Sequence, residues 1–145
     1  MKNVRHLGLM MGLILMLGSC KAPSSSDDSA WDKWQKAKLG SYEMTMKITC
    51  FCLAGRVGPH QIVVKDGAIA TVNGQPYDVS KAYGNLPTID ELFALITIKK
   101  AENPFQSRLN YDPTYGFPSE IYFDPSQNIA DDEIGYQITG FKILK

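Results

Sequence analysis

The sequence predicts a single α+β domain, an antiparallel sheet of five to six strands with two helices packed on one face. Three observations predict this fold class. Long runs of alternating apolar and polar residues indicate half-buried strands. Two other segments carry helix-capping signals before apolar residues at helical spacing. Asp66-Gly67, between two alternating runs, is typical of a tight hairpin turn.

Residues 1–19 are typical of a signal peptide, because a cationic start is followed by an apolar run from Leu7 to Leu17. This run is shorter than the roughly 20 residues that span a bilayer as a helix. Leu17-Gly18-Ser19-Cys20 resembles a bacterial lipobox, so we expect diacylation of Cys20 and a lipid anchor in the cell membrane or outer membrane, facing the periplasm or the cell exterior. The alternative is an ordinary signal peptide that ends at a cysteine by chance.

The next segment, residues 20–29, is small and polar, so we expect a flexible tether to a globular domain over residues 30–145. Removing residues 1–19 takes away Lys2 and Arg5, which leaves 13 basic and 15 acidic side chains and a net charge of −2. This charge favours no nucleic-acid partner.

In the first half of the domain, Ser29 is a candidate N-cap for a helix that places Trp31 and Trp34 in the core and ends at Gly40. A strand over residues 42–52 follows, with Tyr42 and both cysteines on its inward face. Residues 61–65 and 68–72 form the predicted hairpin. Its register places Val64 opposite Ile69 and Ile62 opposite Thr71, and residues 73–86 are expected to be irregular.

In the second half, Thr88 and Glu91 form a capping box for a helix that ends before Asn103-Pro104. Two alternating runs, residues 106–111 and about 119–123, predict a second hairpin with a long tip. The last strand, residues 134–144, changes apolar phase near Gly140, which predicts a bulge there. The two halves look alike, which suggests a tandem helix-plus-hairpin repeat.

Cys50 and Cys52 are the thiols that remain after lipidation of Cys20, in a compartment that permits disulfides. Two cysteines at i and i+2 of a regular strand lie at the limit for a bridge, so a bridge requires a bend. Two glycines and a proline follow within residues 55–59, so we favour an intrachain disulfide. The alternative is a pair of buried free thiols.

The candidate binding element is an aromatic loop, residues 111–118, which we call the aromatic loop throughout. Two prolines fix φ, and Gly116 permits a positive φ between them. Its rings either pack as the loop's own core or form a contact surface. Asp112 is expected to accept hydrogen bonds from its own loop in an Asx-turn. The candidate binding residues are Tyr111, Asp112, Tyr115, Gly116, Phe117 and Pro118.

Motifs for hydrolase, nucleotide and dinucleotide chemistry are absent, so no catalytic residue and no cofactor are assigned. His60, the one histidine after residue 19, is expected at a solvated loop edge. It is the only histidine through which a Ser-His-Asp or Cys-His mechanism could pass.

Two metal sites are alternatives. Cys50, Cys52 and His60 could hold zinc or copper if they converge. An oxygen site for calcium is the other, although Ile129 and Gly135 replace the glycine and glutamate that an EF-hand loop requires. Its candidate ligands are Asp124, Asn128, Asp131, Asp132 and Glu133.

Five short motifs occur in an order that resembles the bacterial family called domain of unknown function 6174. They are Cys50-Phe51-Cys52, the Asp66-Gly67 hairpin, residues 88–93, the aromatic loop and Asp131-Asp132-Glu133. The resemblance implies an exported protein, often a lipoprotein, without an established activity. The helix-and-hairpin plan is also similar to envelope inhibitor and PepSY-like domains by architecture alone. We therefore expect a non-catalytic module that binds an envelope protein or ligand.

Overall fold

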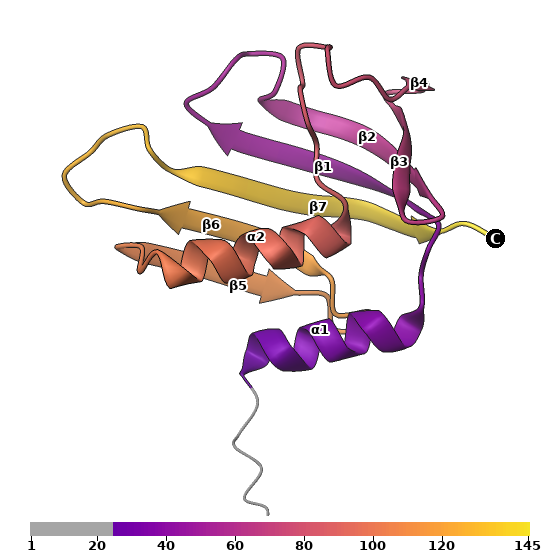
Figure 1. Cartoon of the computed structure of the whole chain (residues 1–145), viewed down its shortest axis with the longest axis horizontal. Helices are drawn as coiled ribbons and strands as arrows, with labels where there is room; N and C mark the ends of the chain where they lie inside the picture. The colour runs from indigo at the N-terminus through magenta and orange to yellow at the C-terminus, as the bar shows by residue number, and fades with distance from the viewer. Residues whose placement is uncertain (1–24) are drawn as a thin grey trace, which may run out of the picture.

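The computed structural model describes residues 25–145 as two layers, a seven-stranded antiparallel sheet and two helices (Figure 1). The α+β class, the antiparallel sheet and the two helices confirm the prediction. The sheet has seven strands and not five to six, because the stretch expected to be irregular adds a two-residue strand. The elements are α1 (Ser26–Ala37), β1 (Tyr42–Cys50), β2 (Gly58–Lys65), β3 (Ala68–Val72), β4 (Gln75–Pro76), α2 (Ile89–Ala101), β5 (Gln106–Tyr111), β6 (Pro118–Asp124) and β7 (Ile134–Ile143).

The strand order is β4-β3-β2-β1-β7-β6-β5, so the last strand lies in the middle of the sheet beside the first. Each half of the chain contributes one helix followed by antiparallel strands. The pairing of β1 with β7 joins the two halves into one sheet. Within residues 25–145, no helix is long and apolar enough to cross a membrane.

The core lies between the sheet and the helices, and Tyr42 is the point where both helices meet it. Alternate residues of β1, from Tyr42 to Ile48, are fully buried, as the alternating sequence predicts. Trp34 of α1 packs edge-on against the Tyr42 ring, with ring centroids 5.5 Å apart. The backbone N–H of Ile89, at the start of α2, donates a hydrogen bond to Tyr42 Oη at 3.0 Å. Both helices therefore cover the same face of the sheet.

The first hairpin confirms the predicted turn and corrects part of its register. Asp66 and Gly67 have φ values of 50° and 79°, as a type I′ turn requires, and Val64 pairs with Ile69. Ile62 pairs with Val72, however, and not with Thr71, because a bulge shifts the pairing between Val63 and Val64. The extra residue in β3 turns Val72 into the core opposite Ile62, where the predicted register would have buried Thr71.

The predicted bulge at Gly140 is present in β7. Thr139 pairs with Thr45, and the next pair along the two strands is Lys142 with Glu43. Strand β7 therefore has one residue more than β1 between these two pairs. Gly140 has a φ of 59°, which glycine adopts without steric cost. The bulge keeps Ile138 and Phe141 on the side of the core despite their odd spacing.

Helix α1 begins and ends earlier than the sequence analysis predicts. Ser25, and not Ser29, is its N-cap, and Ser25 and Asp28 form a reciprocal capping box. Residues 26–29, expected to belong to the tether, form its first turn, where Asp27 and Asp28 complement the helix dipole. The helix ends at Ala37, before Gly40, because Lys38 adopts a left-handed conformation.

Candidate functional site

The aromatic loop is a closed turn that joins β5 to β6. Asp112 Oδ1 accepts hydrogen bonds from the backbone N–H groups of Thr114 and Tyr115 at 3.0 and 2.6 Å, the Asx-turn expected from the sequence. The N–H of Gly116 donates to the Asp112 carbonyl at 2.9 Å, and the N–H of Asp112 donates to the Phe117 carbonyl at 2.8 Å. These bonds fix the backbone of the loop.

The rings of the aromatic loop point into the protein. Phe117 is buried and stacks on Phe141 with ring centroids 4.5 Å apart, and Tyr115 lies 5.6 Å from the same ring. The Tyr111 ring lies parallel to that of Phe93 on α2, at 6.1 Å. Phe117 is therefore a core residue, and the partly buried rings of Tyr111 and Tyr115 pack against the core, which is one of the two alternatives that the sequence leaves open. Only Pro113 and Thr114 of this loop are exposed.

Asp27 connects three elements at the start of α1. Its Oδ1 accepts a hydrogen bond from Tyr111 Oη at 2.8 Å, and its Oδ2 forms an ion pair with Lys100 of α2. Burial raises the pKa of Asp27, but the hydrogen bonds from Lys100 and Tyr111 outweigh it, so the pKa lies below its usual value. Burial and the bond to Asp27 raise the pKa of Tyr111. Asp27 is therefore a stable anion that holds α1, α2 and β5 together.

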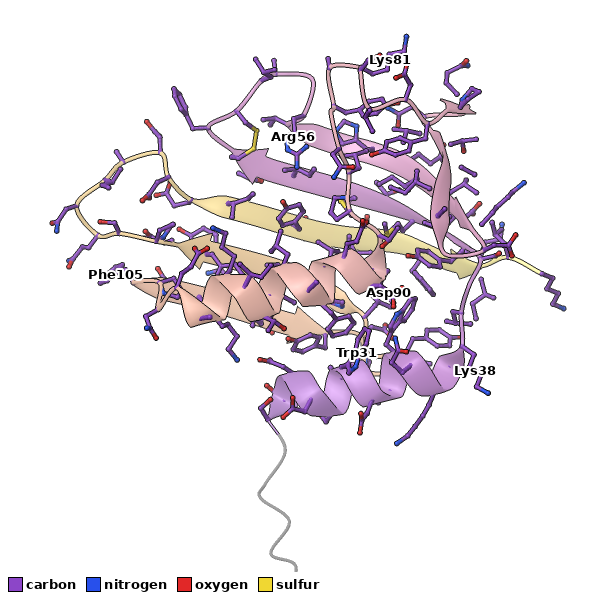
Figure 2. All side chains as sticks on the ribbon, in the orientation of Figure 1. Trp31, Lys38, Arg56, Lys81, Asp90 and Phe105 are labelled. Carbon is purple, nitrogen blue, oxygen red and sulfur yellow. A yellow bond between two sulfur atoms is a disulfide. The ribbon has the colours of Figure 1, made fainter. Side chains whose placement is uncertain are left out.

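A groove of about 440 Å³ lies between α1 and α2, and we call it the helix groove. Its volume falls within the range typical of small-ligand sites. Trp31, labelled in Figure 2, packs edge-on against Phe93 with ring centroids 5.0 Å apart, and both residues line the groove. Its apolar residues are Trp31, Phe93, Ala94 and Ile96, and its charged residues are Asp27, Asp28, Asp90 and Lys100.

The prediction that both tryptophans are core residues is correct for Trp34 and wrong for Trp31. Trp34 is 2% exposed, but Trp31 is 37% exposed. Residues three apart point about 60° apart around a helix, so one faces the sheet and the other faces the neighbouring helix. The sequence holds no signal for this groove, because its two walls are about 60 residues apart in the chain.

A second hollow, of about 450 Å³, lies on the opposite side of α1 against the aromatic loop. Lys33 crosses it, and its Nζ donates a hydrogen bond to the Pro113 carbonyl at 2.7 Å. Tyr111, Asp112 and Gly116 line it. The aromatic loop thus borders this second hollow.

Three of the five predicted oxygen ligands converge where the end of β6 meets the β6–β7 loop. Oxygen atoms of Asp124, Asp132 and Glu133 all lie within 4.8 Å of one another. Asp132 Oδ1 is buried and accepts no hydrogen bond. Asn128 and Asp131 are exposed, and the Asp131 carboxylate does not join the group. In residues 25–145, this is the one group of three or more His, Cys, Asp or Glu residues with the spacing of a metal site.

Cys50 and Cys52 have their sulfur atoms at bonding distance, with Cα atoms 5.4 Å apart. Strand β1 ends at Cys50 and not at residue 52, which supplies the bend that the pair requires.

His60 is buried in β2 and not solvated, because β2 already begins at Gly58 and turns His60 inward opposite Met46. Its Nε2 lies 2.9 Å from the Arg56 carbonyl. Within residues 25–145, Cys50, Cys52 and His60 do not form a group with the spacing of a metal site, so the structure gives no support to the zinc or copper alternative.

Comparison with known proteins identifies one family. A family model described as a family of unknown function (DUF6174) matches residues 26–143, which covers nearly all of the described domain. No curated protein and no solved structure matches the chain.

We predict that Gly116 is required by its contact with α1. Gly116 has a φ of 81°, and a Cβ there would overlap the carbonyl oxygen of Ala30, whereas Gly67 has a φ of 79° in open space. Gly116→Ala should lower the free energy of unfolding by about 3 kcal/mol and Gly67→Ala by about 1 kcal/mol, because both variants strain the backbone but only the first creates an overlap. Equilibrium urea denaturation measures both values. Equal losses would contradict the contact.

Proposed function

This chain belongs to the family of unknown function DUF6174, and we propose that it is a lipid-anchored, non-catalytic binding module of the bacterial envelope, with its ligand in the helix groove. The anchor rests on the sequence alone, because the leader and Cys20 lie outside the described residues. The observation that carries the binding role is an apolar cleft of ligand size beside carboxylates without a cationic partner.

We expect the mature protein to begin at an acylated Cys20. Intact-mass spectrometry of the protein from membranes should show the loss of residues 1–19 and the added mass of acyl chains. A mass lower by two hydrogens would report the bridge between Cys50 and Cys52 in the same spectrum. Cys20→Ser should abolish acylation, and a wild-type protein that retains Met1 and carries no acyl group would overturn the anchor.

The charges around the helix groove favour a cationic ligand. Asp27 is paired with Lys100, but within residues 25–145 Asp28 and Asp90 have no cation within salt-bridge distance. Asp28 accepts the Ser25 N–H, and Asp90 accepts bonds from Trp34 Nε1 and Gln35 at 3.3 and 3.2 Å. These bonds orient both carboxylates without neutralising them. A ligand with an apolar body and a positive charge would contact the aromatic side chains of the groove and its carboxylates at the same time.

The aromatic loop supports this function by holding α1 in place. Its contacts through Gly116 with Ala30, Tyr111 with Asp27 and Pro113 with Lys33 fix one side of α1, while the helix groove lies on the other. We propose that the loop shapes the binding site in this way. Of its two exposed residues, Pro113 lines the second hollow.

A pair of matched probes tests the helix groove. We expect 2-phenylethylamine to bind residues 21–145 more tightly than 3-phenylpropionate. The reason is that the groove places aromatic side chains next to carboxylates that have no cationic partner. Tryptophan fluorescence measures the binding, since Trp31 lines the groove.

Trp31→Ala should abolish the amine response measured by amide chemical shifts, and Phe51→Ala, which removes an exposed ring outside the groove, should not. Equal affinity for the two probes, or shifts confined to another surface, would exclude the helix groove.

A second candidate function is calcium binding in the β6–β7 loop. The buried Asp132 Oδ1 without a hydrogen bond favours it, since a buried carboxylate oxygen ordinarily has a partner. Carboxylate oxygens are the ligands that calcium prefers, and Asp124 and Glu133 complete a set of three residues.

Calcium should raise the melting temperature of the wild-type protein, because an ion that binds only the folded state stabilises it. Asp132→Asn should lose this increase, and Asp32→Asn, an exposed carboxylate on α1, should keep it. Differential scanning fluorimetry with calcium and with magnesium measures the shift. No calcium-dependent shift in the wild type would exclude the site.

We also propose that the two halves are a tandem repeat of the kind seen in PepSY-like and inhibitor-like architectures. Each half begins with a capping box, Ser25 with Asp28 and Thr88 with Glu91, and each helix covers the same face of the sheet. Superposition of the halves tests this proposal, and helices that fail to overlap when the strands are aligned would contradict it.

A further inference from the structure

We propose that one end of the sheet, which we call the apolar end, rests on the bilayer to which the protein is anchored. This inference relies on the lipid anchor proposed above and adds the orientation of the domain and the side chains that touch the lipid. The apolar end comprises the β1–β2 loop, Phe105 before β5, and the β6–β7 loop, which lie together at one end of the sheet (Figure 1).

Exposed apolar side chains gather at this end. Among residues 25–145, five of the nine large apolar side chains that are exposed belong to it, so their clustering distinguishes it from the rest of the surface. Phe51 and Leu53, at the tip of the β1–β2 loop, are 82% and 77% exposed. Phe105 and Ile129 are more than half exposed, and the N–H of Phe105 bonds the Pro125 carbonyl at the base of the β6–β7 loop.

The β1–β2 loop holds its apolar tip outward on a fixed base. Arg56 Nη1 donates hydrogen bonds to the carbonyls of Tyr83 and Asn85 at 3.0 and 2.7 Å. Gly55 packs so closely on Ala82 that a Cβ would overlap it. Because Cys50 and Cys52 enclose Phe51 at the end of β1, the ring is displayed in a preformed position, which lowers the entropy lost on contact.

The length of the tether identifies the bilayer as the surface that meets this end. Only four residues separate Cys20 from the N-cap Ser25, so the Cα atoms of these two residues lie within about 18 Å of each other. Asp27, in the first turn of α1, is ion-paired with Lys100, in the last turn of α2. Helix α2 leads directly to Phe105, which marks this end in Figure 2. The anchor thus holds the apolar end near the membrane.

The charges at this end indicate that apolar contact, not charge, carries the docking. Asp124, Asp131, Asp132 and Glu133 lie in or beside the β6–β7 loop, and Arg56 is already held by two carbonyls. Anionic headgroups would be repelled by these carboxylates. We therefore expect closer contact with zwitterionic than with anionic lipid.

Tryptophan quenching tests the orientation in the mature acylated protein, which begins at Cys20, reconstituted into phosphatidylcholine vesicles with brominated acyl chains. Phe105→Trp and Phe51→Trp each place a reporter at the apolar end, and Ile143→Trp places one at an exposed apolar position at the opposite end, where Ile143 pairs with Tyr42. The wild-type protein already fluoresces through its own tryptophans, so the measured quantity is the extra emission of each variant. This extra emission should be quenched several-fold more for the tryptophans at positions 105 and 51 than for the one at position 143. Vesicles with added phosphatidylglycerol should reduce the difference.

Equal quenching at the three positions, or none at any of them in protein that floats with the vesicles, would overturn the proposal and leave the apolar end to a protein partner. Protein that carries no acyl mass and does not float would instead show that the anchor itself is absent. Near-ultraviolet circular dichroism checks that each variant is folded, and if a variant at position 51 is unfolded, Leu53→Trp replaces it with the same expectation.

Discussion

The pairing of β1 with β7 is the constraint on which the rest of the structure depends. It brings the last strand to the middle of the sheet and joins two helix-and-strand halves along one continuous ladder. Because the halves share one sheet, both helices pack on the same face and become neighbours. The helix groove exists only as a result of this arrangement, since one wall comes from each half.

Asp27 shows how electrostatics adjusts the arrangement that the sheet permits. A carboxylate in the first turn of α1 is favoured by the helix dipole, and here it also accepts bonds from Lys100 and Tyr111. The same residue thus stabilises its own helix and determines how α1 sits against α2. Because the Asp27 side chain is partly buried, this ion pair and the Tyr111 hydrogen bond together hold α1 in a defined position against α2 and β5.

Local signals in the sequence predicted local structure. Asp66-Gly67, the capping box of Thr88 and the bulge at Gly140 each depend on the conformation of a few adjacent residues, and each was correct. The failures depend on contacts between distant segments. The bulge in β3 follows from the burial of Val72. His60 points inward because β2 begins at Gly58. Trp31 is exposed because it faces the groove beside α2 and not the sheet. The sequence named Asp124, Asp132 and Glu133 among five candidate oxygen ligands, but which of the five converge depends on how the chain between β6 and β7 folds.

The central position of β7 has a consequence for biogenesis. Strand β1 gains its second neighbour only when residues 134–143 have been synthesised, after all the other strands. Contacts between segments so far apart in the chain form slowly, because a long loop must close before they can stabilise anything. The amino-terminal half therefore emerges from the ribosome with one edge of its hydrophobic strand unsatisfied, and the native state is reached only after translation has passed the final strand.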